Sequence, residues 1–248
     1  MRKIILISLA VIVSLIGMMY LLIQLSLPDV EPLVHTNPKT TALMEQRKQE
    51  AEKEGKKYKI RQNWVPFNQI PNLFKRTVRI SEDANFYFHE GIDLEELEES
   101  IKKNWEEGEF ARGASTITQQ LAKNLYLSTD KSLWRKIKEI FITRELESTL
   151  SKDRIFHLYL NIIEYGRGIF GVDAASRYYF SKTVSDLNEE EIIRLTAVIP
   201  KPLSVRPDQN SKWVLWRCRW ITDKLLLYKY IETSQHDSLI TLFSPSEP

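Results

Sequence analysis

The chain has 248 residues, of which 35 are basic and 33 acidic, giving a formal net charge of +2 at neutral pH. This balance gives no support for nucleic acid or another polyanion as a partner. The single cysteine, Cys218, excludes an intrachain disulfide, so the apolar core alone must stabilise the fold.

The chain begins with an apolar segment. Residues 4–23 carry no charge, and 13 of these 20 residues are Ile, Leu or Val. A helix of about 20 apolar residues crosses the hydrocarbon core of a bilayer, and no small-residue cleavage site follows this one. We predict an uncleaved transmembrane anchor over residues 1–27. Arg2 and Lys3 precede the span and Asp29 and Glu31 follow it, which predicts a cytoplasmic N-terminus and an outward-facing remainder.

Residues 28–65 differ from both of their neighbours. Three prolines are followed by the charged run MEQRKQEAEKEGKKYK, which has few apolar positions. This composition favours a juxtamembrane stalk, built as an exposed helix or a mobile loop. We place a globular domain over residues 66–230 and a C-terminal tail over residues 231–248.

The apolar spacing of the globular part is helical. It predicts helices over residues 93–105, 116–126, 132–150, 152–163, 171–180, 187–198 and 213–230. In the helix over 132–150, five apolar side chains are expected to face inward: Leu133, Ile137, Ile140, Ile142 and Leu146. Alternating strand patterns are scarce, so the domain is predicted to be mainly α.

Two stretches gather polar side chains. SEDANFYFHEG, residues 81–91, is either the lip of an active site or a polar turn ending at Gly91. In GASTITQQLAKN, residues 113–124, Thr116 and Gln119 fit a capping box. Gln120, Lys123 and Asn124 then share a face with Thr116, and a helix start beside Gly113 would suit a phosphate.

A third stretch, residues 132–147, gathers cations. Arg135 and Glu139 are four residues apart and so face the same way, which is compatible with a simple surface ion pair. The crowding of Arg135, Lys136 and Lys138 on one helix also suits a phosphate-bearing ligand. No spacing matches a structural metal site, a P-loop or a dinucleotide fingerprint.

In this order the motifs resemble those of the peptidoglycan glycosyltransferases, glycosyltransferase family 51, and in particular its monofunctional, membrane-anchored biosynthetic transglycosylases. Four motifs carry the resemblance: E-D-x-x-F-x-x-H-x-G from Glu82 to Gly91, G-x-S-T-I-T-Q-Q-L-x-K-N from Gly113 to Asn124, R-K-x-x-E with a later L-E from Arg135 to Glu147, and S-K-x-x-I with a later Y-L-N from Ser151 to Asn161. From the chain length we expect no transpeptidase domain of the kind that bifunctional relatives carry.

The resemblance implies a lysozyme-like, two-lobed helical fold on the outer face of the bacterial inner membrane. It implies polymerisation of lipid II onto a growing lipid-diphosphate-linked glycan chain, with inversion at the anomeric carbon. Other cell-wall synthesis proteins are expected as partners, and no organic cofactor is expected. Two alternatives stay open: a lysozyme-like hydrolase, which would need no cation cluster, and a non-catalytic scaffold, which would need no motif carboxylates.

The resemblance also assigns roles. Glu82 is the expected base, and its neighbour Asp83 is expected to raise the pKa of Glu82 by like-charge repulsion. Lys123, Arg135 and Lys136 are expected to hold the donor phosphates. Glu139 would orient these cations or bind phosphate through a divalent cation, Mg²⁺ or Mn²⁺. The remaining expected substrate-binding residues are Asp83, Phe86, His89, Ser115, Thr116, Gln119, Gln120 and Asn124.

Overall fold

The computed structural model describes residues 2–107, 115–130 and 132–244. The fold is mainly α, as predicted. The helices are α1 (Arg2–Leu25), α2 (Ala42–Lys53), α3 (Asn72–Glu82), α4 (Leu94–Glu107), α5 (Ile117–Tyr126), α6 (Leu133–Thr149), α7 (Lys152–Ile162), α8 (Val172–Phe180), α9 (Glu189–Val198), α10 (Lys212–Leu227) and α11 (Thr233–Leu242). Short 3₁₀ turns are η1 (Glu31–Val34), η2 (Phe67–Gln69) and η3 (Val184–Asp186).

Side-chain caps explain where several helices begin. Ser132, Ser151 and Ser211 each accept a hydrogen bond from the backbone N–H three residues later, at the starts of α6, α7 and α10. Asn188 forms a complete capping box with Glu191 at the start of α9. Such caps satisfy backbone donors that have no partner within the helix, which is why these boundaries could be placed from sequence.

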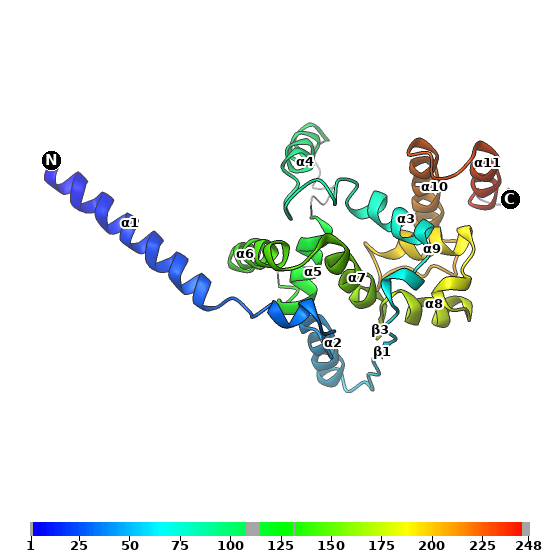
Figure 1. The fold of residues 1–248 in the computed structure, drawn as a ribbon, viewed down its shortest axis with the longest axis horizontal. Coiled ribbons are helices and arrows are strands. Elements are labelled where there is room, and N and C mark those ends of the chain that lie inside the picture. The colour runs from blue at the N-terminus through cyan, green and yellow to red at the C-terminus, as the bar shows by residue number, and fades with distance from the viewer. Residues whose placement is uncertain (1, 108–114, 131, 245–248) are drawn as a thin grey trace.

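The helices of the globular part form two groups (Figure 1). In one group, α5 packs against α2, α6 and α7. In the other, α3, α9 and α10 pack against one another, with α8 against α9 and α11 against α10. A single buried cluster runs through both groups and includes Phe74, Leu121, Tyr159 and Ile193. α4 lies at the upper edge of the globular part in Figure 1.

A small sheet supports the second group. It has the order β1 (Arg61–Gln62), β3 (Ile169–Phe170), β2 (Glu164–Gly166). β1 pairs with β3 in parallel and β2 pairs with β3 in antiparallel orientation. Asn161, at the end of α7, binds the chain leaving β1: its Oδ1 accepts from Val65 N at 2.8 Å. The last motif of the sequence therefore anchors this segment to α7.

Helix α1 extends away from the globular part (Figure 1). Over Lys3–Leu25 it is the one helix in the described part of the chain that is long and apolar enough to cross a membrane. Nearly all of its apolar side chains are exposed, but Ile23 is buried. Tyr20 contacts Phe141 of α6 edge to face, with ring centroids 5.9 Å apart. The last turns of α1 are thus joined to the domain.

The prediction of an exposed or mobile stalk over residues 28–65 was wrong. Leu43, Met44 and Ala51 of α2 are buried, and α2 packs against α5. Arg47 of α2 forms a two-pronged ion pair with the buried Glu164. The segment therefore contains a helix that belongs to the folded domain, although most of its charged residues remain on the surface.

Two smaller expectations also need correction. Leu133 was expected to face inward, but its side chain is 79% exposed because it lies in the first turn of α6, beyond the core. Ile142 and Leu146 on the same helix are buried as predicted. Residues 231–248 were described as a tail, but α11 packs against α10 and buries Leu239 and Phe243.

Candidate functional site

Glu82 is the last residue of α3 and points into the domain. Its side chain is 8% exposed. One carboxylate oxygen accepts from Gln120 Nε2 at 3.2 Å, and the other lies 3.3 Å from the hydroxyl of Ser81. Arg217 NH2, from α10, lies 3.6 Å from the same carboxylate. Three segments distant in sequence therefore meet at this carboxyl group.

Burial raises the pKa of Glu82 above its ordinary value. Arg217, Gln120 and Ser81 oppose this shift, and the like charge of Asp83 adds a smaller increase. The raised pKa agrees in direction with the sequence prediction, but its main cause is burial rather than repulsion by Asp83. A carboxyl group tuned in this way is suited to taking up a proton near working pH.

Asp83 has a structural role in the same turn. One of its oxygens accepts from Ile117 N, at the start of α5, at 2.9 Å. His89 Nε2 lies 3.0 Å from Asp83, and His89 Nδ1 accepts from Gly91 N at 3.0 Å. Because Nδ1 is an acceptor, the ring hydrogen lies on Nε2 and points to Asp83. Asp83 therefore fixes the loop over residues 83–91 to the start of α5.

Gly91 closes this loop for steric reasons. Its φ is +87°, and a Cβ at this position would lie 2.6 Å from the Thr143 methyl and 2.9 Å from Glu147 Cγ. Its carbonyl accepts from the Thr116 hydroxyl at 2.7 Å. A side chain here would strain the backbone and push α6 away.

The aromatic residues of the loop have opposite environments. Phe86 is fully buried against Phe156, and the ammonium group of Lys152 lies 4.5 Å from the centre of its ring. Lys152 also pairs with Glu147 at 2.8 Å. Phe88 is 86% exposed. The expected contact of Phe86 and His89 with substrate stays a prediction.

The start of α5 has the capping box that the sequence predicted. Thr116 Oγ1 accepts from Gln119 N, and Gln119 Oε1 accepts from Thr116 N. Both side chains are buried, as is Asn124 on the same helix. Gly113 lies outside the described residues. For Thr116 and Gln119 the helix cap accounts for the contacts seen.

Gln120 is held in a defined orientation. The hydroxyl of Tyr159 donates to Gln120 Oε1 at 3.0 Å, so the amide nitrogen must face Glu82. Burial raises the pKa of Tyr159 well above its ordinary value, which keeps the hydroxyl protonated as a donor. Tyr159 and Gln120 together position a hydrogen-bond donor on the Glu82 carboxylate.

A cluster of cations surrounds the carboxylate of Glu139, the second acidic residue expected in the site. Glu139 of α6 is 3% exposed, and Arg135 NH1 donates to it at 2.5 Å. Lys136 contacts the other oxygen of Glu139. Lys123 of α5 also interacts electrostatically with Glu139, Arg135 and Lys136, and burial lowers its pKa. We call Lys123, Arg135, Lys136 and Glu139 the cation cluster; its charges sum to about +2 when each group is ionised.

Ser115 links the two carboxylates. Its backbone oxygen lies 3.5 Å from Gln120 Nε2, and its hydroxyl lies 3.5 Å from Lys136 Nζ. The contacts therefore run without a break from Glu82 through Gln120, Ser115 and Lys136 to Glu139. The structure brings the expected base and the expected phosphate-binding residues into one continuous site.

The expected divalent cation does not fit this cluster. Mg²⁺ sites use carboxylate and other oxygen ligands, whereas the single carboxylate here is already bound by two cations. Among the described residues, the ligand atoms of Asp83, His89 and Asp93 also lie within 4.8 Å of one another. In that group His89 Nε2 is directed at Asp83 and Nδ1 accepts from Gly91 N, so both ring nitrogens already have partners.

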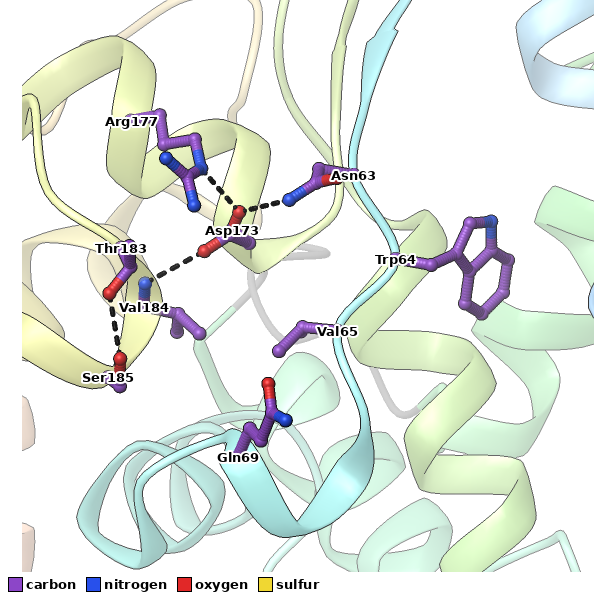
Figure 2. Close-up of a pocket in the computed structure, with 9 residues that line it drawn as sticks. All are labelled: Asn63, Trp64, Val65, Gln69, Asp173, Arg177, Thr183, Val184 and Ser185. Carbon is purple, nitrogen blue, oxygen red and sulfur yellow. Dashed lines mark hydrogen bonds and ion pairs between the residues drawn. The ribbon is translucent and has the colours of Figure 1, made fainter.

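A polar hollow of about 160 Å³ lies elsewhere, where the segment after β1 meets α8 and η3. Figure 2 shows Asp173 at its centre, bound by Asn63, Arg177 and the backbone N–H of Val184. These bonds tie three segments together. The hollow contains none of the residues predicted for the site, and its polar groups have a structural explanation.

Sequence reasoning missed Arg217, Ser81 and the role of Tyr159. Tyr159 falls within the fourth motif, so the sequence marked its position but did not indicate its hydrogen bond to Gln120. Arg217 lies 135 residues from Glu82 on an aromatic-rich helix, and no local pattern marks it. Only the packing of α10 against α3 could have revealed it.

Comparison with known proteins identifies the fold's family. A family model described as Transglycosylase matches residues 47–226, well over half of the chain. The chain belongs to the transglycosylase family. The match covers both carboxylates, the cation cluster and Arg217.

Individual relatives agree with this assignment. A biosynthetic peptidoglycan transglycosylase of Nitrosospira multiformis is 40% identical over 189 residues, covering 76% of this chain and 82% of the relative. One of Dechloromonas aromatica with the same name is 43% identical over 166 residues, covering 67% and 72%. The crystal structure of penicillin-binding protein 1A from Haemophilus influenzae matches with a TM-score of 0.41 and 17% identity, over 77% of this chain and 18% of that one.

Proposed function

We propose that this transglycosylase polymerises peptidoglycan glycan chains. It transfers the growing lipid-diphosphate-linked chain to the 4-hydroxyl of lipid II, forms a β-1,4 bond with inversion and releases undecaprenyl diphosphate. The observation that carries the proposal is the continuous site from the Glu82 carboxyl to the cation cluster. The printed names of the relatives support peptidoglycan as the substrate class.

In the proposed step Glu82 accepts the proton of the acceptor hydroxyl as its oxygen attacks the anomeric carbon. The bond from that carbon to the diphosphate breaks, and the diphosphate leaves with the electron pair. Lys123, Arg135 and Lys136 stabilise the charge that develops on the leaving group. In a largely buried site such cations act more strongly than they would at a surface.

Glu139 has a different task. Held by Arg135 and Lys136, it fixes the directions of their donor groups before substrate arrives. Positioned donors avoid the cost of reorganisation during the reaction. Gln120 and Tyr159 perform the corresponding positioning for Glu82.

We propose that α1 anchors the enzyme in the bacterial inner membrane with its N-terminus inside. The charges flanking the apolar span support this orientation. A reporter fused after Pro248 should then read as extracytoplasmic; a cytoplasmic signal would contradict both the orientation and the access to lipid II on the outer face.

The decisive experiment incubates the purified full chain with lipid II in detergent and separates the products on a gel. We expect a ladder of glycan polymers and release of undecaprenyl diphosphate. The same protein incubated with finished glycan should leave it intact. Cleavage of the finished glycan without polymerisation would favour the hydrolase, and absence of both activities would favour the scaffold.

A further inference from the structure

Arg217 contacts the base from an element that no motif singled out. Its side chain, on α10, is 14% exposed. NH2 donates to the hydroxyl oxygen of Ser81 at 2.9 Å and to the Ser81 carbonyl at 3.2 Å. The same nitrogen lies 3.6 Å from Glu82 Oε1. The Ser81 hydroxyl in turn donates a hydrogen bond to Glu82 Oε1 at 3.3 Å. Arg217 therefore reaches Glu82 both directly, through charge, and through the Ser81 hydroxyl.

The guanidinium group is held in place on its other side. It stacks over the indole of Trp220 with its carbon 4.3 Å from the ring centroid. Residues 217 and 220 lie three apart on α10 and so share a helix face. Arginine is suited to this double role because its planar group stacks on an aromatic ring while its edge donates hydrogen bonds.

The separation from Glu82 matters for the chemistry. At 3.6 Å the contact exceeds hydrogen-bond length, so it acts mainly through charge. Arg135, by contrast, donates directly to Glu139 at 2.5 Å. A direct two-pronged pair would occupy the lone pairs that a base needs, whereas a cation one step away stabilises the ionised form and leaves a lone pair accessible.

Among the described residues, several segments present polar or charged groups to the Glu82 carboxyl. Asp83 follows it in sequence, Gln120 comes from α5, Tyr159 from α7, Tyr165 from β2 and Arg217 from α10. Asp83 is negative, and the buried tyrosines keep their protons because burial raises the pKa of each well above its ordinary value. Within residues 2–107, 115–130 and 132–244, the cation found to act on this carboxyl is Arg217.

We propose that Arg217 is a positioning residue that keeps Glu82 ionised and correctly oriented before the acceptor hydroxyl arrives. This inference rests on the proposed role of Glu82 as the base. It extends the site to α10, outside the four motifs, and assigns Ser81 as the relay between the two side chains.

The test is the pH dependence of lipid II polymerisation by the full chain and its variants. Arg217→Gln should move the acid limb of the kcat profile to higher pH, because Glu82 then stays protonated over a wider range. An opposite charge at this distance shifts a carboxyl pKa by about one unit or more, so activity on the acid side should fall about tenfold or more. It should recover to within about threefold on the alkaline side, with KM for lipid II little changed.

Two further variants bracket this result. Arg217→Lys keeps the charge and should leave the acid limb close to its original pH. Lys224→Gln is the matched control. It removes a cation that lies 5.5 Å from the centre of the same Trp220 ring, and the contacts to Glu82 described above do not involve Lys224. Its profile should superimpose on that of the unmodified protein. Thermal unfolding of each variant reports whether it is folded.

A loss by the same factor at every pH, or an unmoved acid limb, would overturn the inference and leave Arg217 a purely structural residue. If Arg217→Gln does not fold, Ser81→Ala decides, because removal of the relay hydroxyl should move the limb in the same direction by a smaller amount. If the acid limb of the kcat profile of Ser81→Ala is also unmoved, the inference about Arg217 is overturned. A Glu82→Gln protein with normal activity would instead refute the base itself, so the two failures are distinguishable.

Discussion

The two glutamates of the site are similarly buried but have different neighbours. Glu139 is bound directly by Arg135 and Lys136, so both of its carboxylate oxygens are engaged within a cationic network. Glu82 is bound by the neutral groups of Gln120 and Ser81, and its cation stays 3.6 Å away. The comparison teaches that burial alone does not decide what a carboxyl group does. Its partners matter as well: neutral donors hold Glu82, whereas cations hold Glu139.

The largest effect is expected at Glu82. Glu82→Gln keeps the shape and most hydrogen bonds but removes the proton acceptor, and general-base catalysis typically contributes about 10²–10⁴-fold. Initial rates of lipid II polymerisation should fall by that order, while binding of a diphosphate donor analogue is retained. Glu90→Gln makes the same chemical change at an exposed position of the same loop and should be silent. Near-normal elongation by Glu82→Gln would contradict the base assignment.

Glu139→Gln should have the next largest effect, of a different kind. Arg135 and Lys136 lose their shared anchor and no longer hold their directions, and misplacement of about 1 Å can cost about 10²-fold. We expect a loss of about 10–10²-fold that includes weaker binding of the donor analogue. Glu145→Gln, at an exposed position of the same helix, is the control. If Glu139→Gln bound donor normally and lost only turnover, the distinction between the two carboxylates would fail.

Lys123 tests the cation cluster through pH. Lys123→Met should lower donor affinity by about tenfold, as expected for one charged hydrogen bond. Because burial lowers the pKa of Lys123, the cation is lost on raising the pH before an ordinary lysine would lose its charge. Donor affinity should therefore decline on the alkaline side. Lys123→Arg should abolish that decline, since arginine stays charged.

Lys138→Met is the matched control for Lys123, because Lys138 lies over Trp134 on α6 rather than against Glu139. It should change neither the donor affinity nor its pH dependence. An alkaline decline that persists in Lys123→Arg would show that another group is responsible.

The smallest expected effect concerns stability. The folded pKa of Glu82 is raised, so between the unfolded and folded values the folded state binds more protons, and stability falls as pH rises through that window. At neutral pH the ionised carboxyl therefore opposes folding, and Glu82→Gln should unfold at a higher temperature than the unmodified protein. The difference should shrink as the pH falls toward 4.

A chain of this size shifts its Tm by about 2–4 °C for each 1 kcal/mol, so the change is measurable by thermal unfolding in detergent. An unchanged or lower Tm for Glu82→Gln at neutral pH would mean that the Glu82 carboxyl is better solvated than its contacts indicate.

Local signals predicted much of this molecule. Thr116 and Gln119 form the capping box that their spacing indicated, and Ile142 and Leu146 are buried on the expected helix face. Arg135 and Glu139 meet because residues four apart on a helix must share a face. Each of these contacts is fixed by residues close together in sequence.

What escaped prediction depends on packing between distant segments. The charged composition of α2 concealed three buried side chains, Leu43, Met44 and Ala51, whose spacing is too sparse to signal a packed face. The main cause of the raised pKa of Glu82 is burial by α5, α7 and α10, which no pattern within residues 81–91 could show. Arg217 belongs to the site only because α10 packs against α3, a contact between segments far apart in sequence.

If α1 spans a membrane as proposed, the contact between Tyr20 and Phe141 would set the depth of the site relative to the bilayer. A helix of the length of α1 spans about 36 Å, somewhat more than the hydrocarbon core of about 30 Å. In the proposed orientation Tyr20 therefore lies near the outer headgroup layer, where tyrosine is enriched. Phe141 lies two residues beyond Glu139 on α6, so in the proposed orientation the cation cluster would lie near the height at which a lipid carries its phosphates. Enzyme and substrate would then meet by lateral diffusion within a plane, and the search for a substrate loses one dimension.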